Sequence, residues 1–130
     1  MTTPATLSDA RIGQIAIIVH DVPRAVRFYR DALGLRFLFE APPKMAFFDC
    51  GGVRLMLSLP ETRELDHPSS ILYFRVPDIR ATRAELGSRG VAFASEPHLV
   101  ARLPDHDLWL AEFHDEDGNV LALMGEERKA

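Results

Sequence analysis

The chain has 130 residues, of which 47% are hydrophobic and 26% charged, and this length and composition suit one compact domain with a real core. Its formal net charge of -4 gives no general attraction to nucleic acid or to an anionic membrane surface. A single cysteine excludes a disulfide within the chain, and no stretch approaches the roughly 20 apolar residues of a membrane span, so we expect a cytoplasmic protein with no nucleic-acid or membrane partner.

The first half of the chain predicts a strand, a helix and three further strands. The ten N-terminal residues have neither a basic start nor an apolar run, which argues against a secretory signal. The apolar run Ile15 to Val19 predicts a buried strand, and a helix is expected from the capping residue Asp21 to the terminating Gly34. Strands are then expected over 35–39, 46–50 and 53–59.

The second half repeats this order of elements. A strand over 71–76 leads through Pro77-Asp78-Ile79 into a helix that ends at Gly90, and strands follow from 91–93, over 108–114 and over 120–124. Placing Asp21 over Asp78 puts Gln14 over Ile71. The polar segment 60–70 is a linker. Because neither four-stranded half would bury its sheet alone, we predict an α+β protein with module one at about 12–59 and module two at about 71–125.

Three segments resemble the vicinal oxygen chelate superfamily, which covers glyoxalase I, bleomycin-resistance proteins and extradiol dioxygenases. Residues 21–35 carry the distinctive pattern D-x-x-x-A-x-x-F-Y-x-x-x-L-G-L, and residues 73–79 occupy the matching place in the second half. Residues 113–123 are close to the family's Asp-Gly-Asn hairpin, and 98–109 resemble a subgroup labelled only glyoxalase-like. The resemblance implies a single glyoxalase-like domain over 1–130, with two β-α-β-β-β modules forming a curved mixed sheet around a ligand cleft. It also implies a homodimer.

The resemblance further implies one metal ligand on the first strand and one on the last strand of each module. These four positions fall on Gln14, Met56, Ile71 and Ala122. Glutamine is a ligand in some glyoxalase I enzymes, but a thioether is a poor ligand for a hard divalent ion, and the other two side chains are hydrocarbons. A catalytic zinc site takes about three protein ligands. We therefore expect no metal site and no cofactor.

Other polar residues offer candidate contacts to a ligand. His98, His106 and Asp107 are expected in a loop over the open end of the cleft, where they would either contact a ligand or only pack and cap. His106 is the best candidate for proton exchange. Arg54 and Arg75 share strand parity with the metal positions, so they would either face an anionic ligand or pair with acids at the rim.

The alternation of the strand over 108–114 has two interpretations. Glu112 and His114 lie on one side of it, and this side is either solvated or part of a polar cluster with Gln14. Under the solvated interpretation, which we favour, Trp109, Ala111 and Phe113 point inward.

We predict a protein that binds a small organic ligand, is related to glyoxalase and bleomycin-resistance proteins, and lacks the standard metal site. Whether it is an enzyme stays open. The expected ligand contacts are Gln14, Arg54, Met56, Ile71, Tyr73, His98, His106 and Trp109. Two alternatives remain: a metal-dependent lyase or dioxygenase with relocated ligands from Gln14, His98, His106 and Glu112, and a metal-free acid/base catalyst built on His106.

Overall fold

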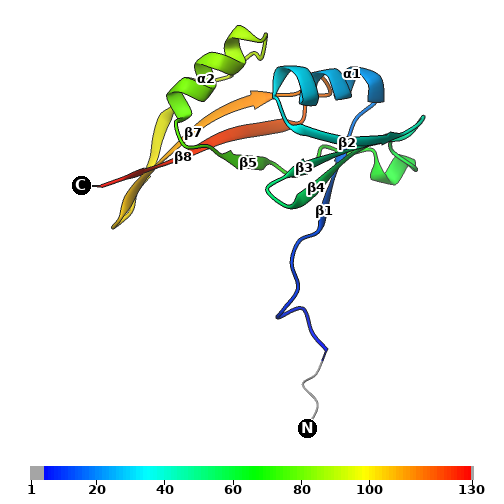
Figure 1. Ribbon diagram of the computed structural model, residues 1–130, viewed down its shortest axis with the longest axis horizontal. Coiled ribbons are helices and arrows are strands. Elements are labelled where there is room, and N and C mark those ends of the chain that lie inside the picture. Colours follow the sequence, from blue (N-terminus) through cyan, green and yellow to red (C-terminus); the bar gives the residue numbers. More distant parts are fainter. Residues whose placement is uncertain (1–4, 130) are drawn as a thin grey trace.

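The computed structural model describes residues 5–129 and forms two four-stranded sheets, each with a helix on one face (Figure 1). The start of the N-terminal segment, on which the absence of a secretory signal was predicted, lies outside the described residues. No helix within residues 5–129 is long and apolar enough to cross a membrane.

Module one has the strand order β1-β4-β3-β2, with β1 parallel to β4 and the other neighbours antiparallel. Its helix begins as an α-helix and continues as a π-helix, in which the Leu33 N–H donates to the Phe28 carbonyl five residues back at 2.9 Å. The elements are β1 (Gln14–Ile18), α1 (Val22–Val26), η1 (Arg27–Ala32), β2 (Arg36–Ala41), β3 (Met45–Cys50) and β4 (Val53–Ser58).

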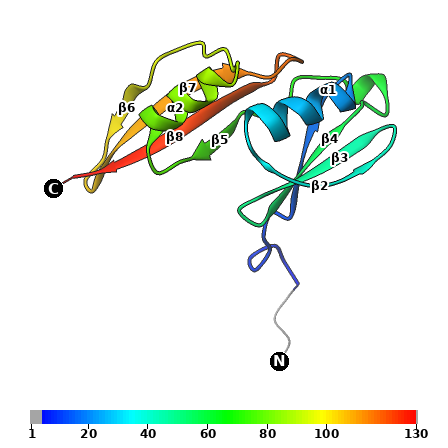
Figure 2. The same cartoon turned by 45° about the horizontal axis from the view of Figure 1, so that its top comes forward.

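Module two repeats this topology with the order β5-β8-β7-β6, as Figure 2 shows from a second direction. A short 3-10 helix, η2 (Arg63–Leu65), lies in the segment between the modules. The remaining elements are β5 (Leu72–Arg75), α2 (Ile79–Ser88), β6 (His98–Arg102), β7 (His106–His114) and β8 (Val120–Arg128). The α+β class and the two β-α-β-β-β modules are confirmed, and hydrogen bonding divides the predicted curved sheet into two sheets.

Matching caps start the helix of each module. The Asp21 carboxylate accepts from the Arg24 N–H at 3.1 Å, and the Asp78 carboxylate accepts from the Ala81 N–H at 3.0 Å. At the other end of the first helix, Gly34 has a φ of 76°, a left-handed conformation that glycine adopts without strain. The internal repeat predicted from the sequence is therefore present at the level of individual capping residues.

The second strand of module two differs from the prediction. Residues 91–93 form no strand, and only Phe93 makes an isolated bridge to Phe113. The strand lies instead at β6, and a turn in which the Leu103 N–H donates to the His106 carbonyl at 2.9 Å joins it to β7. The predicted loop carrying His98 and His106 is therefore wrong. The exposure of the side chains alternates along β6, as expected for a strand whose successive side chains point to opposite faces.

The core lies between each sheet and its helix, because each sheet buries one row of apolar side chains beneath that helix. Tyr29 of η1 packs against Phe48 of β3, with ring centroids 6.1 Å apart. The largest fully buried side chains are Tyr29, Phe48, Phe113, Ile17, Leu57, Leu121 and Val19.

A buried carboxylate, Asp115, joins the two modules. Its Oδ2 accepts from the Tyr29 hydroxyl at 2.7 Å and from Asn119 Nδ2 at 2.8 Å, and its Oδ1 accepts from the N–H groups of Asp117 and Asn119, both at 2.9 Å. Asn119 Nδ2 also donates to the Ile18 carbonyl at 2.9 Å. Burial and the neighbouring Asp115 raise the pKa of Tyr29 well above its usual range, so Tyr29 stays a hydroxyl donor.

We expect Tyr29→Phe to lower the free energy of unfolding by about 1–3 kcal/mol, because it removes one of the two donors to the buried Oδ2 of Asp115. Urea unfolding followed by circular dichroism measures this change. Tyr73→Phe is the matched control, because Tyr73 is half exposed, and it should leave the midpoint unchanged. Equal midpoints for wild type and Tyr29→Phe would contradict this role for the hydroxyl.

His20 links the segment between the modules to the β7–β8 hairpin. Its Nε2 lies 2.8 Å from Asp66 Oδ1 and its Nδ1 lies 2.8 Å from Asp117 Oδ1. Hydrogen bonds to Asp66 and then to Asp117 raise the pKa of His20 above its ordinary value of 6.5. Protonation of His20 therefore favours the folded state. This contribution is fully present below about pH 6.5 and is lost as the pH rises through the folded pKa.

An NMR titration of the imidazole should give His20 a pKa above 6.5. Asp66→Asn should move the pKa back toward 6.5, whereas Asp9→Asn, a charge change in the N-terminal segment, should not. A His20 pKa at or below 6.5 in the wild-type protein would show that the two contacts are not held in solution.

Candidate functional site

Strand parity gives each sheet one helix-covered face and one open face. In module one, Leu55 and Leu57 are buried beneath the helix. Met56 lies between them and Arg54 precedes them on β4, so the side chains of Arg54 and Met56 point to the open face. In module two, a Cβ at Gly125 would lie 3.0 Å from the Ile79 side chain, so this position faces α2. Alternate positions of β8 therefore point to the open face; they are Ala122, Met124, Glu126 and Arg128.

Three of the predicted ligand contacts meet on the open face of module one. Arg54 Nε donates to Gln14 Oε1 at 2.8 Å, and Gln14 Nε2 lies 3.6 Å from Met56 Sδ. The Arg54 guanidinium also lies 5.4 Å from the centroid of the Phe47 ring, which stacks on Phe39 at 4.5 Å. The result is a surface with an amide and a guanidinium beside apolar side chains. We call these five residues the Gln14 surface.

The other two positions that the resemblance assigns to metal ligands belong to module two. Ile71 precedes β5 and is 46% exposed, and Ala122 on β8 is fully covered. Tyr73, 50% exposed, pairs with Ala122 across β5 and β8. Ile71 and Tyr73 therefore share one open edge of module two.

The donor set does not fit the divalent ion of the metal-dependent superfamily members. Of the four positions only Gln14 carries an oxygen donor, and that oxygen already accepts from Arg54. Met56 offers a thioether, and Ile71 and Ala122 offer none. Within residues 5–129, no group of three His, Cys, Asp or Glu side chains is arranged to hold a metal ion.

A carboxylate lies one strand away from the Ala122 position. Glu112 on β7 is the direct cross-strand partner of Ala122 and shares its open face. Ser95 Oγ donates to Glu112 Oε2 at 2.6 Å, and His98 Nε2 lies 3.5 Å from Glu112 Oε1. The face that carries Glu112 and His114 is thus the same open face on which the metal positions of module two lie.

The structure does not bring His98 and His106 together. His98 pairs with Leu110, four residues along β7 from His106, which corresponds to about 13 Å of strand. The four relocated ligands of the metal-dependent alternative therefore do not converge within one chain. Only His98 and Glu112 are neighbours.

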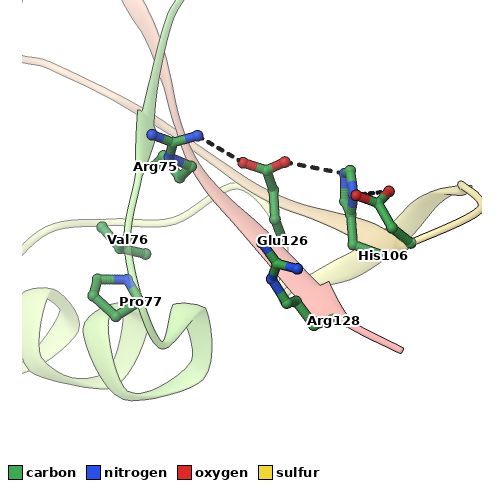
Figure 3. A pocket seen from close by; sticks show the side chains of 7 residues that line it. Arg75, Val76, Pro77, His106, Glu126 and Arg128 are labelled. Carbon is green, nitrogen blue, oxygen red and sulfur yellow. Dashed lines mark hydrogen bonds and ion pairs between the residues drawn. The ribbon is translucent and has the colours of Figure 1, made fainter. Parts of the chain in front are cut away.

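His106 lies in a pocket at the end of the second sheet where β5 and β8 end and β7 begins (Figure 3). Its Nε2 is 3.0 Å from Glu126 Oε2, and its Nδ1 is 2.8 Å from Asp105 Oδ1. Arg75 Nη1 donates to the second Glu126 oxygen at 3.0 Å. Arg75 thus pairs with an acid at the rim of the sheet, one of the two roles considered for it.

Trp109 lies apart from the other predicted contacts. It packs against the core on the helix-covered face, with the Arg80 guanidinium of α2 4.7 Å from its ring centroid. The inward direction of Trp109, Ala111 and Phe113 agrees with the interpretation favoured from the alternation of β7.

Several residues of these clusters were absent from the predicted set. Glu126 and Arg128 could have been found by counting four and six residues along β8 from Ala122, since even steps keep the same face. No local signal in the sequence places Ser95 beside Glu112, because the pairing depends on the path of residues 94–97.

These features define a glyoxalase-type protein, and the sequence confirms the class. The profile of the glyoxalase/bleomycin resistance protein/dioxygenase superfamily matches residues 11–123, and the chain belongs to this superfamily. Bacillus subtilis (strain 168) has two relatives described as uncharacterized. YraH is 29% identical and YetH is 25% identical, and each match covers 87% of this chain and 96% of the relative.

Solved structures share the fold. A superfamily member from Sphaerobacter thermophilus DSM 20745 is 25% identical with a TM-score of 0.75, and the match covers 90% of this chain and 98% of that chain. The lactoylglutathione lyase from Agrobacterium tumefaciens is 21% identical with a TM-score of 0.69, covering 89% of this chain and 93% of that chain. At this identity the second likeness concerns the fold alone.

Proposed function

We propose that this protein binds a small organic molecule at the Gln14 surface, on the open face of module one, without the superfamily's standard divalent metal. The observation that carries the proposal is the state of Gln14. Its amide is held between Arg54 and Met56, and the other three metal positions have no oxygen or nitrogen donor.

The Gln14 surface suits a ligand that has an apolar body and a few polar groups. Phe39 and Phe47 present a stacked aromatic pair, and Phe39 is 48% exposed. Arg54 and Gln14 supply the hydrogen-bonding groups that would orient the ligand. No metal cofactor enters this proposal.

We also propose a homodimer. β1 and β5 are terminal strands of their sheets, so within residues 5–129 each pairs along only one side. Beside β5 the apolar Ile71 and the ring of Tyr73 are about half exposed. A second copy would cover these side chains. It would also place an open sheet face of one copy opposite an open sheet face of the other. The free Cys50 suits a reducing compartment, which supports a cytoplasmic location.

The second candidate is a metal-dependent lyase or dioxygenase with relocated ligands. The observation that favours it is the His98–Glu112 pair one strand from Ala122. In this case His98 and Glu112 would coordinate the metal ion together with at least one further ligand. Removing the metal with a chelator would then abolish ligand binding.

A thermal-shift screen of small aromatic acids and amides in the presence of EDTA tests the two candidates. Compounds that raise Tm should do so equally with and without EDTA. Arg54→Gln should weaken their binding about tenfold, because it removes a charged hydrogen-bond donor from the ligand surface. Leu65→Ala, an exposed change in η2, is the control. Binding that EDTA abolishes and His98→Ala removes would favour the second candidate instead.

The dimer is tested by multi-angle light scattering at micromolar concentration. The expected mass is twice that of one chain. Ile71→Asp should shift the mass toward that of one chain by placing a charge in the covered apolar region, and Leu7→Asp, at a residue that is 85% exposed, should not. A one-chain mass for the wild-type protein would reject the dimer.

A further inference from the structure

The pocket at the far end of the second sheet has the size and the chemistry of a ligand site. Its volume is about 390 Å³, and ligand pockets generally span about 300–1,000 Å³. Figure 3 shows side chains from the end of β5, the start of β7 and the end of β8 around it. They are Arg75, Val76, Pro77, Asp105, His106, Glu126 and Arg128. None of them belongs to the Gln14 surface.

Four charged or polar groups form a series across this pocket, from Arg75 through Glu126 and His106 to Asp105 (Figure 3). The two carboxylates of the series differ in their contacts and exposure. The Glu126 carboxylate is held by Arg75 on one oxygen and by His106 on the other, and its side chain is 31% exposed. The Asp105 side chain is 72% exposed, and its only ion-pair contact among residues 5–129 is His106 Nδ1 at 2.8 Å.

The position of the Asp105 carboxylate, beside His106 Nδ1, is one where the pocket stabilises a negative charge. The hydrogen bond from His106, a backbone hydrogen bond and the charges of His106 and Arg128 hold the pKa of Asp105 below its usual range, so it is a carboxylate near neutral pH. Arg128 pairs with His106 across β8 and β7 and makes no ion pair within the described part of the chain. A guanidinium is therefore available beside the imidazole for a second carboxylate.

We propose that the pocket binds a small carboxylate that carries an apolar group, and that Asp105 is its internal competitor. The ligand carboxylate replaces the Asp105 side chain at His106 Nδ1 and pairs with Arg128. The apolar group lies against Val76 and Pro77. Because Asp105 is exposed and belongs to a turn, it leaves the imidazole without disturbing the strands, while Glu126 and Arg75 keep the imidazole in place.

Benzoate is the probe, and the His106 imidazole nitrogens observed by NMR are the reporter. Titration of the full-length protein should give a saturable shift of the His106 signals, and the neutral analogue benzamide should give none. Asp105→Asn should tighten benzoate binding about two- to fivefold, the effect of removing one exposed ion-pair competitor. Arg128→Gln should weaken it at least about fivefold by removing the free guanidinium.

Two charge-matched controls accompany these variants. Asp9→Asn and Arg63→Gln lie outside the pocket and should leave benzoate binding unchanged. Amide spectra of each variant check that the fold is kept. The proposal is overturned if millimolar benzoate leaves His106 unshifted in Asp105→Asn, or if either pocket variant binds benzoate as the wild type does. The His106 signals report this pocket alone, so the result is separate from binding at the Gln14 surface, none of whose residues lines the pocket.

Discussion

The buried Asp115 carboxylate at the β7–β8 hairpin fixes how module two meets module one. A buried carboxylate is costly unless its lone pairs are satisfied, and here four donors reach its two oxygens, including the Tyr29 hydroxyl from the helix of module one. Asn119 extends the network to the Ile18 carbonyl at the end of β1 and accepts from the Ser69 N–H before β5. The ends of β1 and β5 are therefore tied to one hairpin, and their open faces inherit its geometry.

Once the modules are placed, strand parity determines which side chains a ligand can reach. The helices occupy one face of each sheet and bury the apolar rows beneath them, as the Ile79–Gly125 contact shows for α2. All four inherited metal positions belong to the opposite, open faces. On these faces the polar groups include Gln14 and Arg54 in module one, and Glu112, His106 and Glu126 in module two. The chain thus has the fold of the superfamily, and of the four positions that the resemblance assigns to metal ligands only Gln14 carries an oxygen donor, while other polar groups are clustered nearby.

Much of this fold could be predicted because its signals are local. Asp21 and Asp78 cap helices in matching positions, Gly34 ends the first helix, and Asp117-Gly118 turns the last hairpin, so each module was recognisable from short segments. The strand β6 was mistaken for a loop because Pro97 and Pro104 flank it, yet both prolines lie just outside the paired residues. Proline disrupts a strand only where its missing N–H is needed.

The candidate sites were less predictable because they depend on register between strands. His106 and Glu126 are 20 residues apart and meet only through the pairing of β7 with β8, and Ser95 reaches Glu112 through an irregular segment. His98 and His106 are close in sequence, but His98 lies on β6 opposite Leu110, four residues along β7 from His106. By contrast, Gln14, Arg54 and Met56 could be grouped from the sequence. Arg54 and Met56 share the parity of β4, and Gln14 lies opposite Arg54 on the first strand of the same module.

The central claim is that ligand binding by this protein does not use the inherited metal centre. Elemental analysis by inductively coupled plasma mass spectrometry, on protein purified without chelator and dialysed, tests it most directly. The account predicts nickel, zinc, iron and manganese far below one ion per chain. Any of these metals bound near one ion per chain after dialysis would contradict it.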